Sequence, residues 1–183
     1  MTILTLTLPR PTVDEAVFRD AMAHLASGVA VAACWDGEEP RGLLVSSLTA
    51  LSTEPPRVLF CVAKTASAHN ALLKAQECSL ALLAEADRDE AERFSQRDRA
   101  GDRFDPRQWE LTPEAPPRRL DALVAIQGFI DQKINAGSHS IFIVRVTAAD
   151  VLDHAPLVYF DRAFRRLAAI EAPLELPLAS VRA

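Results

Sequence analysis

Hydrophobic residues near the N-terminus recur at helical spacing. The positions concerned are Val17, Phe18, Ala21, Met22 and Leu25. Residues three or four positions apart share one face of a helix, so the pattern predicts an amphipathic helix. Thr12 and Glu15 have the spacing of a capping box that would begin this helix, and Gly28 suits its C-terminal end.

After this helix the pattern changes to short apolar runs separated by turn residues. The run over residues 29–35 (VAVAACW) is rich in small and β-branched side chains, which predicts a strand. Asp36-Gly37 is a dipeptide that tight hairpins prefer, so the run over 42–51 is expected to return antiparallel to it. Further strands are expected over residues 57–63, 78–84, 123–134, 140–146 and 156–160. Short helices are expected over residues 68–76 and 87–95.

Two connecting segments stand out in the second half of the chain. Residues 96–119 carry Asp, Arg and Pro at high density, and a connection of this length is usually functional or disordered. Its large anchors are Phe94, Phe104 and Trp109. Residues 135–139 (NAGSH) are predicted to form a hairpin loop between two strands. Residues 164–170 are expected either to continue the last strand or to turn helical.

Strands joined by hairpins, with helices at the N-terminus and in the crossovers, predict a β-rich α+β fold. The expected architecture is an antiparallel barrel with peripheral helices. A length of 183 residues favours one domain. We expect an N-terminal extension over 1–13, a single domain over 14–170 and a C-terminal tail over 171–183.

Composition narrows the possible partners. The formal net charge is −5 and charged residues make up 25% of the chain, so neither nucleic acid nor an acidic membrane surface is expected as a partner. No apolar run reaches the roughly 18 residues of a membrane span, and no signal sequence is recognisable. We therefore expect a cytoplasmic protein.

The cysteines and histidines do not indicate a metal site. Cys34, Cys61 and Cys78 are odd in number, form no CxxC motif and lie in apolar runs, so we expect three buried, reduced thiols. The four histidines show no ligand spacing with these cysteines or with each other. Dinucleotide-binding, phosphate-loop and GxSxG motifs are also absent. Residue patterns alone thus lead to a β-rich domain without an assigned function.

Five collinear segments resemble the flavin reductase domain family, the short reductase components of two-component flavin monooxygenases. The segments lie between residues 18 and 167 and read FRDAMAHLASGVAVAA, PRGLLVSSLTALSTEPPRVLFCVAKTAS, AERFS, AGSHSIFIVRV and PLVYFDRAFRRL. The resemblance implies a homodimeric split barrel that binds one FMN or FAD per subunit near the dimer interface. It also implies reduction of this flavin by NADH or NADPH and delivery of reduced flavin to a partner monooxygenase.

The resemblance assigns two segments to the flavin. The first comprises Ser46, Ser47, Leu48 and Thr49, which would line the isoalloxazine edge and the ribityl chain; without the family, a mid-strand serine that satisfies a backbone carbonyl is the simpler interpretation. The second comprises Cys61, Val62, Ala63, Lys64, Thr65 and Ser67. Lys64 would balance negative charge at the phosphate or at O2 of the ring, or else is a solvated charge at a strand end. Ser67 is placed to cap the next helix near a phosphate.

Two further segments complete the implied site. Phe94, Ser95 and Arg103 belong to a region that closes over the ribityl-phosphate or adenylate end of the flavin, although a phenylalanine there also suits the core. His139 corresponds to a position beside the nicotinamide, where it would hold the nicotinamide C4 against flavin N5. From spacing alone, His139 is an ordinary polar residue of a hairpin loop.

Two alternative functions remain open at this point. The same barrel could retain its flavin and reduce another acceptor, such as a corrinoid or a ferric complex. It could also be a non-enzymatic flavin-binding dimeric module, an alternative favoured by Leu44 and Val144, which stand where the family usually has threonine and glycine. The sequence does not choose between FMN and FAD or between NADH and NADPH.

Overall fold

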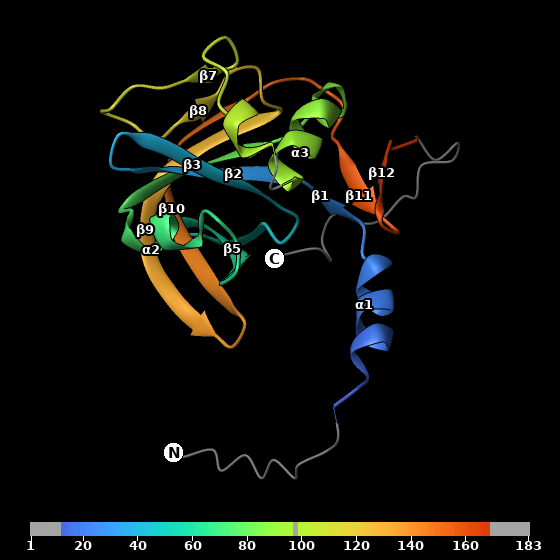
Figure 1. The fold of residues 1–183 in the computed structure, drawn as a ribbon. Coiled ribbons are helices and arrows are strands. Elements are labelled where there is room, and N and C mark those ends of the chain that lie inside the picture. Colours follow the sequence, from blue (N-terminus) through green and yellow to red (C-terminus); the bar gives the residue numbers. More distant parts are fainter. Residues whose placement is uncertain (1–11, 97–98, 169–183) are drawn as a thin grey trace.

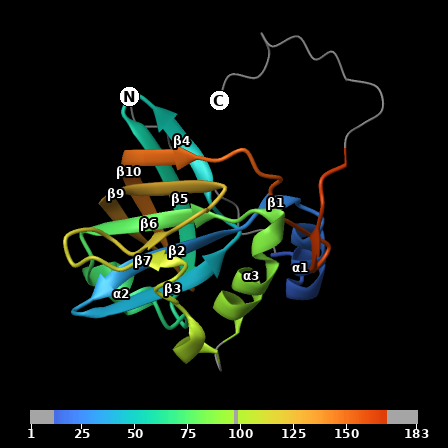
Figure 2. The same cartoon turned by 90° about the horizontal axis from the view of Figure 1, so that it is seen from above.

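The computed structural model describes residues 12–96 and 99–168, and its centre is one seven-stranded antiparallel sheet. Its strands, in spatial order, are β3 (Glu39–Val45), β2 (Ala30–Asp36), β6 (Glu77–Leu82), β9 (Val124–Ala136), β10 (His139–Val151), β5 (Pro56–Ala63) and β4 (Thr49–Thr53). The sheet coils until β3 approaches β5 (Figures 1 and 2). The fold is therefore the expected antiparallel split barrel.

Two small sheets and short helices surround the barrel. The small sheets contain β1 (Ser27–Gly28), β11 (Val158–Phe160) and β12 (Ala163–Arg165), and β7 (Trp109–Glu110) and β8 (Arg118–Arg119). The helices are α1 (Glu15–Ala23), α2 (His69–Lys74), α3 (Arg88–Ser95) and the 3-10 turns Glu85–Asp87 and Ala100–Asp102. None of the helices in the described residues is both long and apolar enough to cross a membrane.

Two hydrophobic clusters lie on opposite faces of β2. Ala30, Ala32 and Cys34 face a cluster inside the barrel, where the rings of Phe60 and Phe142 stack with centroids 5.3 Å apart. The alternate residues of the same strand face a second cluster beneath α3. Because β2 is buried on both faces, its sequence is a continuous apolar run rather than an alternating one.

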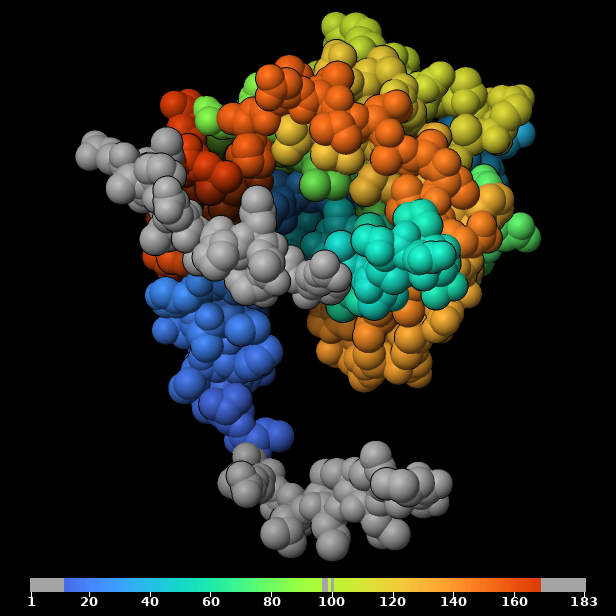
Figure 3. Space-filling model, turned by 180° about the vertical axis from the view of Figure 1, so that it is seen from behind, coloured from blue at the N-terminus to red at the C-terminus, as the bar shows by residue number. Residues whose placement is uncertain are grey.

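Helix α1 exists as predicted, but its cap and its surroundings differ from expectation. Asp14, not Thr12, is the N-cap, and its carboxylate accepts a hydrogen bond from the Ala16 N–H at 2.8 Å. The helix ends at Ala23, so Gly28 lies beyond it in β1. The predicted apolar face is exposed rather than packed on the core, and α1 extends away from the body (Figures 1 and 3).

The predicted strand over residues 42–51 is in fact two strands. The hairpin at Asp36-Gly37 is confirmed, with Gly37 at φ +66°. However, β3 ends at Val45, and β4 begins at Thr49 and pairs with β5 on the opposite edge of the sheet. Residues 46–48 therefore cross from one edge of the barrel to the other, and the serines are not in the middle of a strand.

The hairpin between β9 and β10 is longer and tighter than predicted. Its turn consists of Gly137 and Ser138 alone, with Gly137 at φ +64°, as the first residue of a type II′ turn requires. His139 is thus not a loop residue. It is the first residue of β10, paired with Ala136 on one side and Ala63 on the other.

The remaining expectations are partly met. Residues 163–165 form β12, which folds back on β11, so the first two residues of 164–170 continue as a strand. The expected tail over 171–183 and most of the N-terminal extension lie outside the described residues. Cys34 and Cys78 are buried free thiols, but Cys61 is only half-buried.

Candidate functional site

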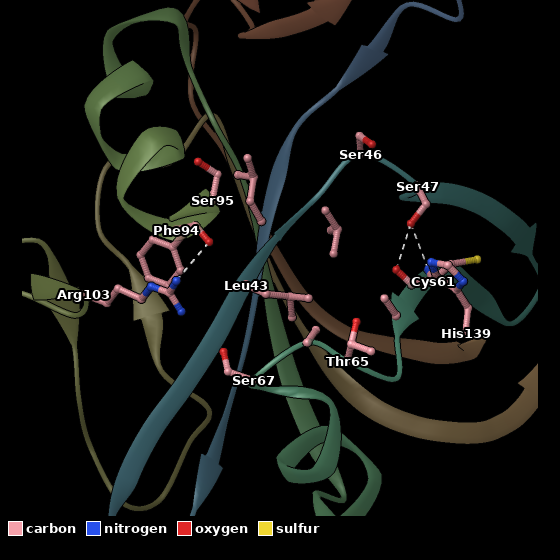
Figure 4. Close-up of a pocket in the computed structure, with 14 residues that line it drawn as sticks. Leu43, Ser46, Ser47, Cys61, Thr65, Ser67, Phe94, Ser95, Arg103 and His139 are labelled. Carbon is pink, nitrogen blue, oxygen red and sulfur yellow. Dashed lines mark hydrogen bonds between the residues drawn. The ribbon is translucent and has the colours of Figure 1, made fainter. Parts of the chain in front are cut away.

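A cavity of about 490 Å³ opens beside the segment that crosses from β3 to β4 (Figure 4). Its walls come from β3, the end of β5, the loop before α2, the end of α3 and the start of β10. Most of the residues that the sequence indicated line it. They are Ser46, Ser47, Cys61, Ala63, Ser67, Phe94, Ser95, Arg103 and His139.

The other predicted residues do not line this cavity. Leu48 and Thr49 face a separate apolar depression that Val58 and Ile126 also line. Val62 points into the barrel core and is 1% exposed. Lys64 lies at the surface outside the cavity. Alternation along β5 accounts for Val62, because neighbouring residues of a strand face opposite sides and its neighbours Cys61 and Ala63 line the cavity.

Thr65, which belongs to the second predicted segment, also lines the cavity, and four further lining residues were not assigned to the site from the sequence. They are Leu43, Leu44, Val45 and Ala66. The first three precede Ser46 along β3 and form an apolar wall, while Ala66 lies between Thr65 and Ser67. The signal that could have found them is their adjacency to the predicted segments, since the chain turns around the cavity at both places.

Ser47 is held by two hydrogen bonds to one residue of β5. Its Oγ accepts from the Cys61 N–H at 2.9 Å and donates to the Cys61 carbonyl at 3.2 Å. The hydroxyl therefore makes the two hydrogen bonds that the backbone of a paired strand residue would make. These bonds tie the crossing segment to β5. Because a hydroxyl has one proton and two lone pairs, Ser47 retains only acceptor capacity for a ligand.

Lys64 stabilises the hairpin that carries His139. Its backbone N–H donates to the Ser138 carbonyl at 3.0 Å, and its Nζ donates to Asn135 Oδ1 at 2.7 Å. The end of β5 is thereby fastened to both sides of the β9–β10 turn. The prediction of Lys64 as a cation beside the cofactor finds no support in this geometry.

Arg103 provides positive charge at one end of the cavity. Its guanidinium donates to the backbone carbonyls of Gly42, Arg93, Phe94 and Gln96 at 2.7–3.3 Å. It also lies 5.3 Å from the centroid of the Phe94 ring. Burial lowers the pKa of Arg103. Within the described residues no carboxylate pairs with this guanidinium, so its charge is available to an anion.

His139 lies at the other end, beside Cys61 (Figure 4). Its Nδ1 is 2.9 Å from Ser138 Oγ, and the side chain is exposed. Figure 4 shows Leu43, Ser46 and Thr65 between this end and the end formed by Arg103 and Phe94. The cavity is thus elongated, with an imidazole at one end and a guanidinium at the other.

The local fold explains two other predicted residues. Ser67 does not cap α2, because the N-cap is Ala68 and no side chain bonds to the first turn; Ser67 is an exposed residue at the cavity rim. Phe94 is both core and wall: it is 2% exposed, and it packs against Phe104 and Trp109 with ring centroids 5.1 and 5.6 Å apart. The anchors of the polar connection therefore form one aromatic cluster.

A buried ionic network fixes α3 beneath the cavity. The Glu90 carboxylate is 3% exposed and accepts from Trp109 Nε1 and from Arg93 Nη1, each at 2.7 Å. Arg119 lies 3.8 Å from the same carboxylate and donates to Asp87 at 2.9 Å. Since buried charges are tolerated only when paired, these contacts set the position of α3 and of the wall it contributes.

These features fit a flavin nucleotide. Ligand cavities of this size accept such molecules, and the apolar wall of β3 suits a flat ring system. Hydroxyl and backbone groups at the crossing segment can meet the polar edge of the ring, which would otherwise be buried without partners. Arg103, lacking a carboxylate partner in the described residues, can meet a phosphate.

Comparisons with known proteins agree with this geometry. Residues 22–168 match the family model described as flavin reductase like domain. The chain is 33% identical over 150 residues to "FMN reductase (NADH) SmoA" of Agrobacterium fabrum, covering 81% of this chain and 84% of that protein. It is 31% identical over 156 residues to "Actinorhodin polyketide dimerase" of Streptomyces coelicolor, covering 84% and 87%.

A solved structure shows the same fold. The NADH:FAD oxidoreductase SgcE6 of Streptomyces globisporus, in complex with NAD and FAD fragments, superposes with a TM-score of 0.79. The sequences are 28% identical, and the match covers 89% of this chain and 100% of that one. The family model spans most of the chain in a single continuous match. The chain belongs to the flavin reductase like domain family.

Proposed function

We propose that this chain is an NAD(P)H:flavin oxidoreductase that reduces FMN or FAD and supplies the reduced flavin to a partner monooxygenase. The observation that carries the proposal is the elongated cavity with Arg103 at one end and His139 at the other. Relatives named FMN reductase (NADH), and a relative named as the reductase subunit of a flavin-dependent monooxygenase, support it.

The two ends have different tasks in this proposal. Arg103 binds the flavin phosphate, and the segment from Ser46 to Ser47 meets the polar edge of the ring. A flavin bound here would supply N5 as the acceptor for a hydride from the nicotinamide C4. His139 holds the nicotinamide by a hydrogen bond so that these two atoms stay close, and it transfers no proton in this step. The protein thus contributes orientation to chemistry that the two cofactors carry.

The test separates the two ends of the cavity. Oxidation of NADH and of NADPH is followed at 340 nm with FMN, FAD and riboflavin offered separately. We expect Arg103→Ala to raise KM for FMN but to leave KM for riboflavin, which has no phosphate, almost unchanged. Arg107→Ala is the matched control, because Arg107 is an exposed arginine of the same segment outside the cavity. Equal losses with FMN and riboflavin would contradict the phosphate role.

A second set of measurements addresses the nicotinamide and the flavin acceptor. His139→Ala should lower kcat/KM for NAD(P)H several-fold to about a hundredfold, with flavin affinity nearly unchanged. Ultrafiltration after reduction should find the flavin in the filtrate. Flavin that stays with the protein and reduces an added ferric complex would favour the retained-flavin alternative, and binding without any NAD(P)H oxidation would favour the non-enzymatic module.

We also propose that the chain is a homodimer. Three apolar side chains of α1 and one just beyond its end are 48–61% exposed: Val17, Phe18, Met22 and Leu25. An exposed apolar patch of this kind is typical of an interface. Light scattering should give twice the chain mass, and Phe18→Glu should reduce it, whereas Arg19→Glu on the polar side of α1 should not. A wild-type monomer at micromolar concentration would overturn the proposal.

Two smaller proposals complete this description. Residues 14–170 act as one domain, which the continuous family match over 22–168 supports. The protein works in the cytoplasm, and its three free thiols suit a reducing compartment.

A further inference from the structure

The backbone around His139 leaves its ring as the only adjustable part. The residue is paired on both sides, with Ala63 of β5 and Ala136 of β9. The preceding residue, Ser138, is also fixed, because its carbonyl accepts the Lys64 N–H at 3.0 Å. The direction in which the imidazole presents its nitrogens therefore depends on its side-chain torsions alone.

Packing does not settle those torsions. The His139 side chain is exposed, and in the described part of the chain its ring has one hydrogen bond, to Ser138 Oγ, with Nδ1 and Oγ 2.9 Å apart. The tight turn fixes the Ser138 backbone from which this hydroxyl extends, since Gly137 takes the positive φ that a two-residue turn needs. The hydrogen bond between this hydroxyl and Nδ1 selects one orientation of an otherwise free ring.

We propose that Ser138 is a positioning residue, whose hydroxyl holds the His139 imidazole by Nδ1 so that Nε2 faces the nicotinamide. The inference rests on the proposed function of His139. A hydroxyl can donate to Nδ1 or accept from it, so it satisfies this nitrogen in either tautomer of the neutral ring. Nε2 remains as the single ring nitrogen for the second substrate, whose carboxamide has both a donor and an acceptor.

Kinetics test the positioning role. Ser138→Ala should lower kcat/KM for NADH or NADPH by about two- to tenfold, the effect of one hydrogen bond that orients another group. Ser138→Thr keeps the hydroxyl and should restore most of the loss. Flavin affinity should not change in either variant. Thr147→Val is the matched control, since it removes an exposed hydroxyl further along β10 that donates to the Gln127 carbonyl of β9, outside the cavity.

A double-mutant cycle shows whether Ser138 acts through His139. In the His139→Ala background, Ser138→Ala should cause no further loss, because the ring it orients is gone. Additive losses would mean that Ser138 acts on the substrate directly or only on the turn, and would overturn the inference. Full activity of Ser138→Ala in the wild-type background would overturn it as well.

Imidazole nitrogen NMR separates this inference from the proposed function. The Nδ1 resonance of His139 should move in Ser138→Ala and return towards its original position in Ser138→Thr. If His139→Ala leaves turnover intact, the proposed role of His139 fails, whatever the spectra show. If His139→Ala lowers turnover while Ser138→Ala changes neither turnover nor the Nδ1 resonance, the proposed function stands and the positioning role of Ser138 is wrong.

Discussion

Replacing Glu90 by glutamine should destabilise the protein far more than the small chemical change suggests. The carboxylate is 3% exposed and accepts from Trp109 Nε1 and Arg93 Nη1, with Arg119 3.8 Å away. In Glu90→Gln the amide oxygen can accept from only one side, while the NH₂ group meets a second donor. Two guanidinium groups then lose their shared counter-charge in a buried place.

The expected loss in the free energy of unfolding depends on which partners Arg93 and Arg119 keep in the variant. Breaking a buried ion pair from one side costs about 3–5 kcal/mol. Arg119 keeps its hydrogen bond to Asp87, and the Arg93 side chain is 19% exposed, so we expect the lower end, ~3 kcal/mol. The matched control is Glu92→Gln on the same helix. Glu92 pairs with Arg88 at the surface, and such a pair contributes only about 0.3–0.5 kcal/mol.

Urea unfolding of the ligand-free protein, followed by circular dichroism, measures both variants. The midpoint should fall strongly for Glu90→Gln and hardly at all for Glu92→Gln, with similar slopes. Because α3 carries Phe94 and Ser95 into the cavity wall, FMN affinity should decrease with the first variant only. A difference between the variants below about 1 kcal/mol would refute the view that this network fixes α3.

Three other outcomes are expected. Gly128→Ala should lower the free energy of unfolding by ~1–3 kcal/mol or more in urea, because a Cβ at this position overlaps the Arg145 carbonyl. Gly28→Ala should not destabilise the protein, because there is open space around Gly28. Cys61, which lines the cavity, should react with a thiol reagent and be protected by FMN, while buried Cys34 stays unlabelled by mass spectrometry. Burial raises the pKa of Cys34 from 9.0 to about 12. The unfolded thiol therefore ionises first, so the free energy of unfolding should fall as pH rises from about 9 to about 12, and fall less in Cys34→Ala.

The sequence predicts well those parts of the fold that depend on local pattern. The apolar run of β2 and the Asp36-Gly37 turn are both visible in a few consecutive residues, and both are confirmed. The division of residues 42–51 is different. Its second half leaves β3 because β4 pairs with β5, and no property of the run itself indicates a partner on the opposite edge of the sheet.

The candidate site shows the same limit. The resemblance brings together residues that do line one cavity, yet it cannot say which way each side chain points. Lys64 illustrates this, because its position at a strand end suits a cofactor cation equally well. Its actual partners, Asn135 and Ser138, come from a hairpin about seventy positions away and exist only once β5 lies beside β10. The helix cap expected at Thr12 differs for a simpler reason, since Asp14 offers a better-placed carboxylate.

The two ends of the cavity are held in place by separate sets of contacts. Their functions should therefore be separable by mutation. The end that holds Arg103 depends on α3 and hence on the buried Glu90 carboxylate. The end that holds His139 depends on the β9–β10 turn, which Lys64 fastens to β5. The crossing segment is tied to β5 by the hydrogen bonds of Ser47 to Cys61. A defect in the α3 network should therefore weaken phosphate recognition before nicotinamide recognition, and a defect in the turn should do the reverse. A flavin-binding module without hydride transfer would need the contacts that fix α3 but not those that fix the β9–β10 turn. The firm attachment of the turn therefore favours the reductase.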